Sequence, residues 1–136
     1  MKKVLIVGLG VWLVMGGCMN IQVKENQFKQ VDRCGQVLRH VVLFAFKADS
    51  SPSDIRKIEN DFAALPSKVE TVYDFEWGTD VSVENLAQGY THCFVVTFRS
   101  EEGRADYLPH PAHQEFGALL KPHLEKVLVV DYWTKE

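Results

Sequence analysis

The chain has 136 residues, of which 46% are hydrophobic and 24% are charged, and this length and composition are typical of one globular domain. Its 15 basic and 18 acidic side chains give a formal net charge of -3, and no basic cluster follows Lys2 and Lys3. We therefore expect no nucleic-acid partner, because contact with a phosphate backbone requires a basic surface.

Residues 1–17 have the pattern of an export signal. Two lysines precede an almost wholly apolar stretch from Val4 to Met15. That stretch is shorter than the about 20 residues that a membrane-spanning helix needs. The pattern therefore favours an export signal over a permanent membrane span.

Met15-Gly16-Gly17-Cys18 resembles the lipobox of bacterial lipoproteins, in which the cysteine thiol is acylated and becomes the new N-terminus. The resemblance implies a signal peptide at 1–17, lipidation of Cys18 and a lipid anchor in a bacterial membrane, facing the periplasm or the outer surface of the cell envelope. An ordinary secretory peptide and an uncleaved anchor are the alternatives. We expect residues 18–37, which are mostly polar, to be a spacer. A disulfide between Cys34 and Cys93 is left open.

The remaining chain shows six alternating segments. Residues 38–47, 69–77, 90–99 and 127–133 have the composition and period of strands, whereas 52–65 and the segment after Pro111 have the period of helices. A short helical turn is expected after Ser100. This order predicts an α+β, ferredoxin-like βαββαβ fold.

Two local signals set the expected bounds of the helices. Ser51-Pro52-Ser53-Asp54 is an N-cap followed by proline at the first helical position. The second helix is expected to carry an apolar stripe and to kink or break at Pro122. The residues of that stripe are Phe116, Leu119, Leu120 and Leu124.

Three of the predicted strands carry apolar residues on both faces. Helices can cover only one face of such a sheet, and burial of apolar area stabilises by about 25 cal/mol per Å². A second copy of the chain is the expected cover for the other face. The sequence therefore predicts a homodimer.

The segment from Asp106 to Phe116 is the densest in chemical groups. Helical spacing is expected to turn His113 inward, where a neutral imidazole could accept a proton while the Tyr107 hydroxyl holds a substrate oxygen. The alternative is structural: His113 is a hydrogen-bonded core residue, His110 caps the helix and the Tyr107 hydroxyl lies at the surface. His40 and His92 are expected to be hydrogen-bonded core residues.

No metal or other cofactor is expected. The five histidines lack the His-Glu-x-x-His spacing, and no Cys-x-x-Cys pair occurs. A glycine-rich phosphate loop and a Gly-x-Ser-x-Gly elbow are also missing from the sequence.

Four separated segments resemble the stress-responsive A/B barrel (Dabb) family: Leu38–Lys47, Gly89–His92, Tyr107–His113 and Asp131-Tyr132. The resemblance covers about residues 38–134 and implies a dimeric α/β barrel. A plant member of the family cyclises a linear polyketide by aldol condensation without a cofactor. By resemblance His113 would be the general base and Tyr107 would position the substrate. The implied ligand contacts are His40, Val42, Phe44, Ile58, Phe62, Phe94, Leu108, Phe116, Gly117 and Leu124.

Three functions are compatible with these observations. The first is an anchored module that binds a small apolar or aromatic molecule in a barrel pocket. The second is a cofactor-independent cyclase or lyase acting through His113 and Tyr107. The third is a structural dimer that contributes to stress tolerance by assembly alone.

Overall fold

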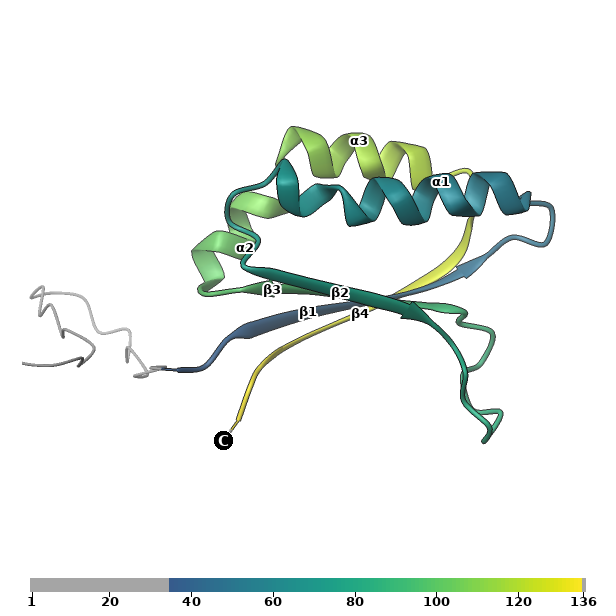
Figure 1. The fold of residues 1–136 in the computed structure, drawn as a ribbon, viewed down its shortest axis with the longest axis horizontal. Helices are drawn as coiled ribbons and strands as arrows, with labels where there is room; N and C mark the ends of the chain where they lie inside the picture. The colour runs from purple at the N-terminus through teal and green to yellow at the C-terminus, as the bar shows by residue number, and fades with distance from the viewer. Residues whose placement is uncertain (1–34, 136) are drawn as a thin grey trace, which may run out of the picture. The chain divides into compact units, whose positions relative to one another are not determined.

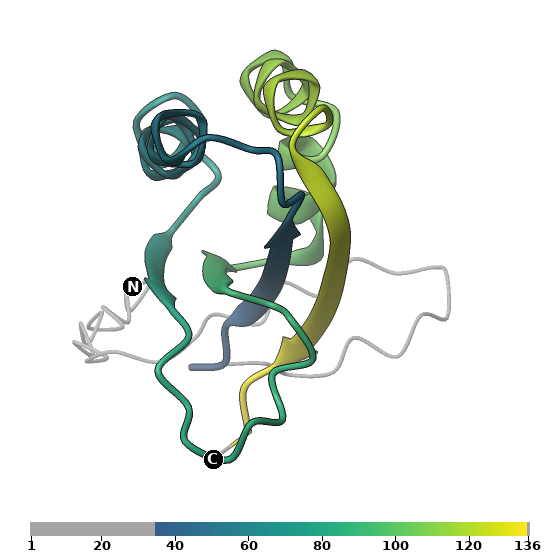
Figure 2. The same ribbon diagram turned by 90° about the vertical axis from the view of Figure 1, so that its right-hand side faces the viewer.

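A computed structural model describes residues 35–135 of the chain. They form one four-stranded antiparallel sheet with α-helices on one of its faces (Figures 1 and 2). The predicted signal peptide, Cys18, most of the spacer and Cys34 lie outside the described residues. Within residues 35–135 no helix has the length and apolar character that crossing a membrane requires.

The order of elements confirms the predicted ferredoxin-like α+β fold. The elements are β1 (Leu38–Phe46), α1 (Pro52–Ala63), the 3-10 turn η1 (Leu65–Ser67), β2 (Asp74–Thr79), β3 (His92–Phe98), α2 (Glu101–Tyr107), α3 (Pro111–Leu120) and β4 (Leu124–Trp133). The strand order is β2-β3-β1-β4, and β1 pairs antiparallel with both β3 and β4. β1 is therefore a central strand.

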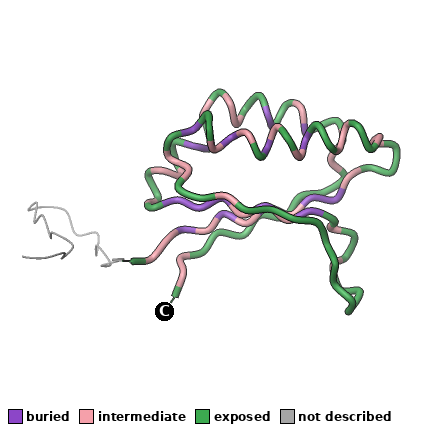
Figure 3. The backbone as a smooth tube through the Cα atoms, in the orientation of Figure 1, coloured by how far each residue is buried: buried purple, intermediate pink, exposed green. Residues whose placement is uncertain are grey.

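Alternation along β1 and β3 places one set of side chains under the helices. This helix-facing set packs with residues of α1, α2 and α3 into a single core, which appears as the buried layer in Figure 3. The core residues are Leu38, Val42, Phe44, Ile58, Phe62, Leu65, Val69, Phe94, Val96, Phe98, Tyr107, Phe116 and Leu120. Phe62 stacks on Phe94 with ring centroids 4.3 Å apart and lies 4.6 Å from Phe116, so aromatic packing joins both long helices to the sheet.

The predicted start of the second strand, at Val69, is wrong. Residues 69–72 instead form a turn: the Val69 amide donates to the Leu65 carbonyl and the Val72 amide donates to the Val69 carbonyl. Val69 is buried at 2% exposure, so its apolar side chain is part of the core next to η1. The strand begins at Asp74 and continues through Gly78 to Thr79.

The prediction that Leu124 belongs to the helical stripe is also wrong. α3 ends at Leu120 and a turn follows, in which the His123 amide donates to the Leu120 carbonyl. Pro122 cannot donate to a continuing helix. Leu124 opens β4 and pairs with Phe46 of β1.

The sheet face opposite the helices, here named the open face, is covered by no described element. By alternation it carries Val41 and Leu43 of β1, which are partly exposed, and three β4 residues that are 39–48% exposed, namely Leu128, Val130 and Tyr132. An apolar surface of this kind on the adjacent strands β1 and β4 is unusual for a protein surface that stays in water.

The predicted cap of α1 is confirmed as a capping box. The Ser51 hydroxyl accepts a hydrogen bond from the Asp54 amide at 3.1 Å, and the Asp54 carboxylate accepts one from the Ser51 amide at 3.2 Å. These two bonds satisfy amide groups that the first turn of a helix leaves without partners.

Replacement Ser51→Ala is expected to lower the free energy of unfolding by about 1 kcal/mol, the usual cost of a lost N-cap. Urea denaturation of residues 35–136 measures this loss. Ser53→Ala is the matched control. It removes the contact between the Ser53 and Ser51 hydroxyls at the surface but leaves both capping bonds between Ser51 and Asp54 in place. An equal loss in both variants would contradict the capping account.

Candidate functional site

The candidate site lies where α2 passes into α3. α2 ends at Tyr107, and the Leu108 and His110 amides close the turn onto the Arg104 and Tyr107 carbonyls. α3 then begins at Pro111, with the His110 imidazole accepting from the Ala112 amide at 3.2 Å. The predicted cap by His110 is confirmed, and this tight connection sets Tyr107 and His113 against each other.

Tyr107 is almost completely buried, at 1% exposure, so the structural alternative that places its hydroxyl at the surface is wrong. The centroid of its ring lies 5.2 Å from that of Phe98 and 6.1 Å from that of His40. The hydroxyl oxygen has no hydrogen-bond partner among the described residues. Burial raises the pKa of Tyr107, so the phenol stays protonated and is a hydrogen-bond donor.

His113 is half-buried beside that phenol, with ring centroids 4.4 Å apart. Its Nδ1 lies 2.8 Å from the Leu108 carbonyl, which can only accept, so Nδ1 carries the proton and Nε2 is the basic nitrogen. Burial lowers the pKa of His113, opposed in part by the bond to the Leu108 carbonyl. The imidazole is therefore neutral at neutral pH and able to accept a proton.

A second histidine faces Tyr107 from β1. His40 is buried, and its Nδ1 lies 2.6 Å from Asp131 Oδ1 on the neighbouring strand β4. The other carboxylate oxygen of Asp131 accepts from Arg104 Nη1 at 2.7 Å. A carboxylate oxygen accepts hydrogen bonds, so His40 Nδ1 is the donor in this pair. Three elements thus fix the orientation of His40.

Sequence reasoning assigned no role to Asp131 or Arg104 at this site. A signal for Asp131 was present, because an acidic residue interrupts the apolar run Val127–Val130, and antiparallel pairing sets it opposite His40. No pattern identifies Arg104, since α2 meets β4 only through the fold.

The predicted ligand contacts fall into two groups. Six are core residues at 0–6% exposure: Val42, Phe44, Ile58, Phe62, Phe94 and Phe116. Leu108 is 41% exposed, Gly117 is exposed with open space where a Cβ would stand, and Leu124 is partly buried. The structure brings Tyr107, His113 and His40 together, and the role of the other residues as ligand contacts stays a prediction.

His92 belongs to a separate cluster at the other end of the helix-facing side. Its Nε2 lies 2.9 Å from Glu59 of α1, and its Nδ1 lies 2.8 Å from the Thr91 hydroxyl. The expectation of a hydrogen-bonded core histidine is confirmed. Residues 35–135 contain no group of three or more His, Cys, Asp or Glu side chains placed to hold a metal ion.

An antiparallel sheet with helices on one face defines a ferredoxin-like domain, and here a Tyr–His pair lies between the sheet and the helices. The chain belongs to the Stress responsive A/B Barrel Domain family, which its residues 38–134 match. It is 47% identical to the stress-response A/B barrel domain-containing protein HS1 of Arabidopsis thaliana over 95 residues, covering 70% of this chain and 87% of that protein.

Two further relatives carry enzyme names. Olivetolic acid cyclase of Cannabis sativa is 34% identical over 95 residues, covering 70% of this chain and 94% of that protein. The structure of hydroxynitrile lyase from Passiflora edulis is similar with a TM-score of 0.70 at 30% identity, covering 74% of this chain and 94% of the lyase. That lyase chain consists almost entirely of the matched domain, which in the lyase folds without a counterpart of residues 1–34.

More distant solved structures share the fold alone. Three bacterial proteins of this fold, at 23–24% identity and TM-scores of 0.58–0.63, are described as dimeric.

NMR titration of the imidazole protons in residues 35–136 is expected to show His113 changing charge below its ordinary pKa of 6.5, because burial penalises the imidazolium. Between the folded pKa and 6.5 the unfolded chain binds more protons, so this residue weakens folding as the pH falls through that window. The same chain in urea is the control. A folded midpoint at or above 6.5 would contradict the burial account.

Proposed function

We propose that this domain binds a small apolar or aromatic molecule bearing a carbonyl or hydroxyl group and acts on it by proton transfer, as a cofactor-independent cyclase or lyase. The observation that carries this proposal is the buried Tyr107 hydroxyl, which has no partner among the described residues and lies beside His113. A buried hydroxyl without a partner costs about 1–3 kcal/mol. A substrate oxygen that accepts its proton removes that cost.

The proposed roles follow from the tautomers. The Tyr107 hydroxyl donates to the substrate oxygen, and His113 Nε2 takes a proton from the substrate. For a hydroxynitrile, His113 removes the hydroxyl proton, the carbonyl π bond forms as the C–C bond to the nitrile carbon breaks, and cyanide leaves with the electron pair. The imidazolium then returns its proton to cyanide. The Asp131 carboxylate holds the His40 imidazole. That imidazole is a second polar group in contact with the Tyr107 ring.

The names of two relatives support this class of reaction. Olivetolic acid cyclase and hydroxynitrile lyase both name reactions at small organic molecules. A module that binds without turnover, and a dimer without a ligand, are the competing functions. Replacement of His113 separates them, because binding alone does not require a base.

Mandelonitrile, an aromatic hydroxynitrile, is the probe for the lyase reaction, with benzaldehyde release followed by absorbance. Residues 35–136 are expected to release benzaldehyde above the buffer rate, and His113→Ala and Tyr107→Phe each to lower the enzymatic rate at least about 100-fold, the lower end for loss of acid–base catalysis. Glu115→Gln, on the exposed side of α3, is expected to keep the rate.

Two results would count against the proposal. One is that the domain shows no turnover and that added benzaldehyde does not shift the NMR resonances of His113. The other is turnover that survives His113→Ala.

We further propose that the domain is a homodimer joined through the open faces of two copies. Four strands of one copy cannot close a barrel, whereas eight strands are enough. The bacterial proteins with this fold that are described as dimeric support a dimer. Burial of Leu128, Val130 and Tyr132 would remove the apolar surface that the monomer exposes.

Replacement of two neighbouring valines of β4 tests which face of the sheet forms the dimer interface. Val130 lies on the open face and Val129 on the helix-facing side, at 48% and 50% exposure. Val130→Lys is expected to make the domain monomeric in sedimentation at micromolar concentration, because it places a charge inside the interface. Val129→Lys is expected to stay dimeric. Dissociation by both variants, or by neither, would contradict the open-face dimer.

The N-terminal sequence supports a proposed lipid anchor at Cys18. The full chain expressed in a bacterium is expected to partition into the membrane fraction with an acyl-modified Cys18 by mass spectrometry. Cys18→Ser is expected to lose the acyl mass. A chain cleaved elsewhere and recovered without acylation would instead indicate an ordinary secretory peptide.

A further inference from the structure

The connection between β2 and β3, residues 80–91, projects from the sheet on the side away from the helices (Figures 1 and 2). It carries three strongly exposed aliphatic side chains: Val81 at 87%, Val83 at 97% and Leu86 at 72%. Single exposed apolar residues are ordinary on protein surfaces. Three on one short connection are a larger apolar patch, and we name this connection the arm.

The arm is tied to the sheet at its base. The Asp80 amide donates to the Thr91 carbonyl and the Thr91 amide to the Phe44 carbonyl, both at 2.9 Å. From β4, Lys126 Nζ donates to the Gln88 carbonyl and lies 4.6 Å from the centre of the Tyr90 ring. Strands β1 and β4 thus hold the base of the arm beside the sheet.

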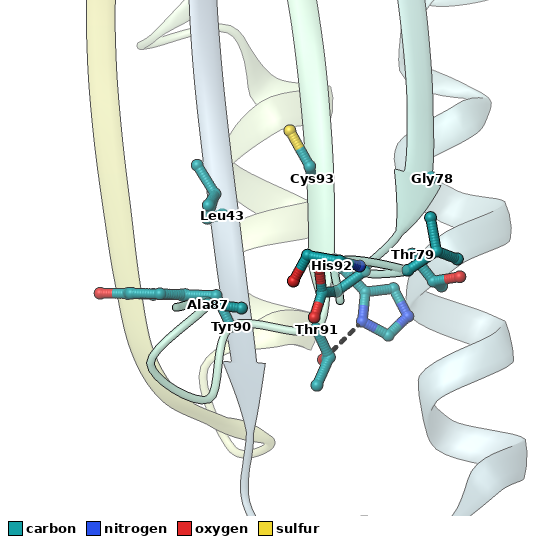
Figure 4. A pocket seen from close by; sticks show the side chains of 11 residues that line it. Leu43, Gly78, Thr79, Ala87, Tyr90, Thr91, His92 and Cys93 are labelled. Atoms are coloured by element: carbon teal, nitrogen blue, oxygen red, sulfur yellow. Dashed lines mark hydrogen bonds between the residues drawn. The ribbon is translucent and has the colours of Figure 1, made fainter. Parts of the chain in front are cut away.

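The arm is continuous with the open face. A hollow of about 430 Å³ lies between them (Figure 4). Its walls include Ala87 and Tyr90 of the arm, and Leu43 and Cys93, whose side chains alternate onto the open face. A molecule that packs at this end of the open face therefore also meets the arm.

The size of the open face indicates that the arm takes part in the interface. Four strands about 4.8 Å apart and on average about eight residues long present a flat area on the order of 500 Å². A stable interface buries about 800 Å² on each partner. The sheet alone falls short of that area, and the arm is the adjacent apolar surface that can supply the remainder.

We propose that residues 80–91 are an intersubunit arm, whose Val81, Val83 and Leu86 side chains pack against a second copy of this chain at the edge of the open-face interface. This proposal rests on the proposed dimer. In a symmetric pair each copy gives one arm and receives one. A side chain of the second copy enters the hollow between arm and sheet.

The test is the dimer dissociation constant of residues 35–136, measured by sedimentation velocity. The variant Val83→Glu with Leu86→Glu changes two side chains that are exposed in the single chain, so folding is preserved. We expect its dissociation constant to rise at least about tenfold, because both charges would enter an apolar contact. The control is Ala105→Glu with Ala118→Glu, which adds the same charge at exposed positions of α2 and α3 and is expected to match the wild type.

Reaction of Cys93 with an aromatic disulfide gives a second readout, since it is the one thiol in residues 35–136 and it lines the hollow. We expect slow reaction in the wild-type dimer and faster reaction in the arm variant at the same concentration. A wild-type monomer would overturn the dimer itself. A wild-type dimer whose dissociation constant and Cys93 rate are unchanged in the arm variant would overturn the arm and leave the dimer standing.

Discussion

The register of β1 between β3 and β4 is the constraint on which the rest of the domain depends. β1 is hydrogen-bonded along both edges, with His40 opposite Val96 on one side and Asp131 on the other. A slip by one residue would turn Val42 and Phe44 out of the core and expose His40 on the open face. The same register therefore fixes the core, the polar site and the apolar surface offered to a second copy.

The aromatic core then positions the catalytic candidates from above the sheet. Phe62 of α1 stacks on Phe94 of β3 and packs against Phe116 of α3, so α3 is joined to the sheet through α1. The short connection from α2 to α3 brings Tyr107 under His113. Two groups of opposite chemical character result: a phenol whose pKa is raised by burial and an imidazole whose pKa is lowered by burial. Pairs of titratable groups whose pKa values are shifted in opposite directions by their surroundings are typical of acid–base sites.

Much of this architecture was predictable because it depends on local patterns. Alternation indicated that β1 and β3 carry apolar residues on both faces, and Ser51-Pro52 marked the start of α1. The start of β2 was missed because Val69 has the spacing of a strand residue while a local turn buries it. Leu124 was assigned to the wrong element because its apolar character suits a helix stripe and a strand equally.

The polar network was less predictable because it is made by distant parts of the chain. His40 and Asp131 are separated by 91 positions, and only strand pairing brings them together. Arg104, which donates to Asp131, belongs to a third element, the helix α2. The burial of the Tyr107 hydroxyl depends on packing of Phe98 and His40 around it, which no local pattern describes.

We propose that the Tyr107 hydroxyl is held without a protein partner so that it can donate to a bound molecule. The most direct test is urea unfolding of Tyr107→Phe beside the wild-type domain, with the exposed Tyr73→Phe as control. The Tyr107→Phe domain is expected to be at least as stable as the wild type, because the removed hydroxyl makes no hydrogen bond. A loss of about 1 kcal/mol or more, the value of an ordinary hydrogen bond, would show that the hydroxyl is bonded within the protein and would contradict the account.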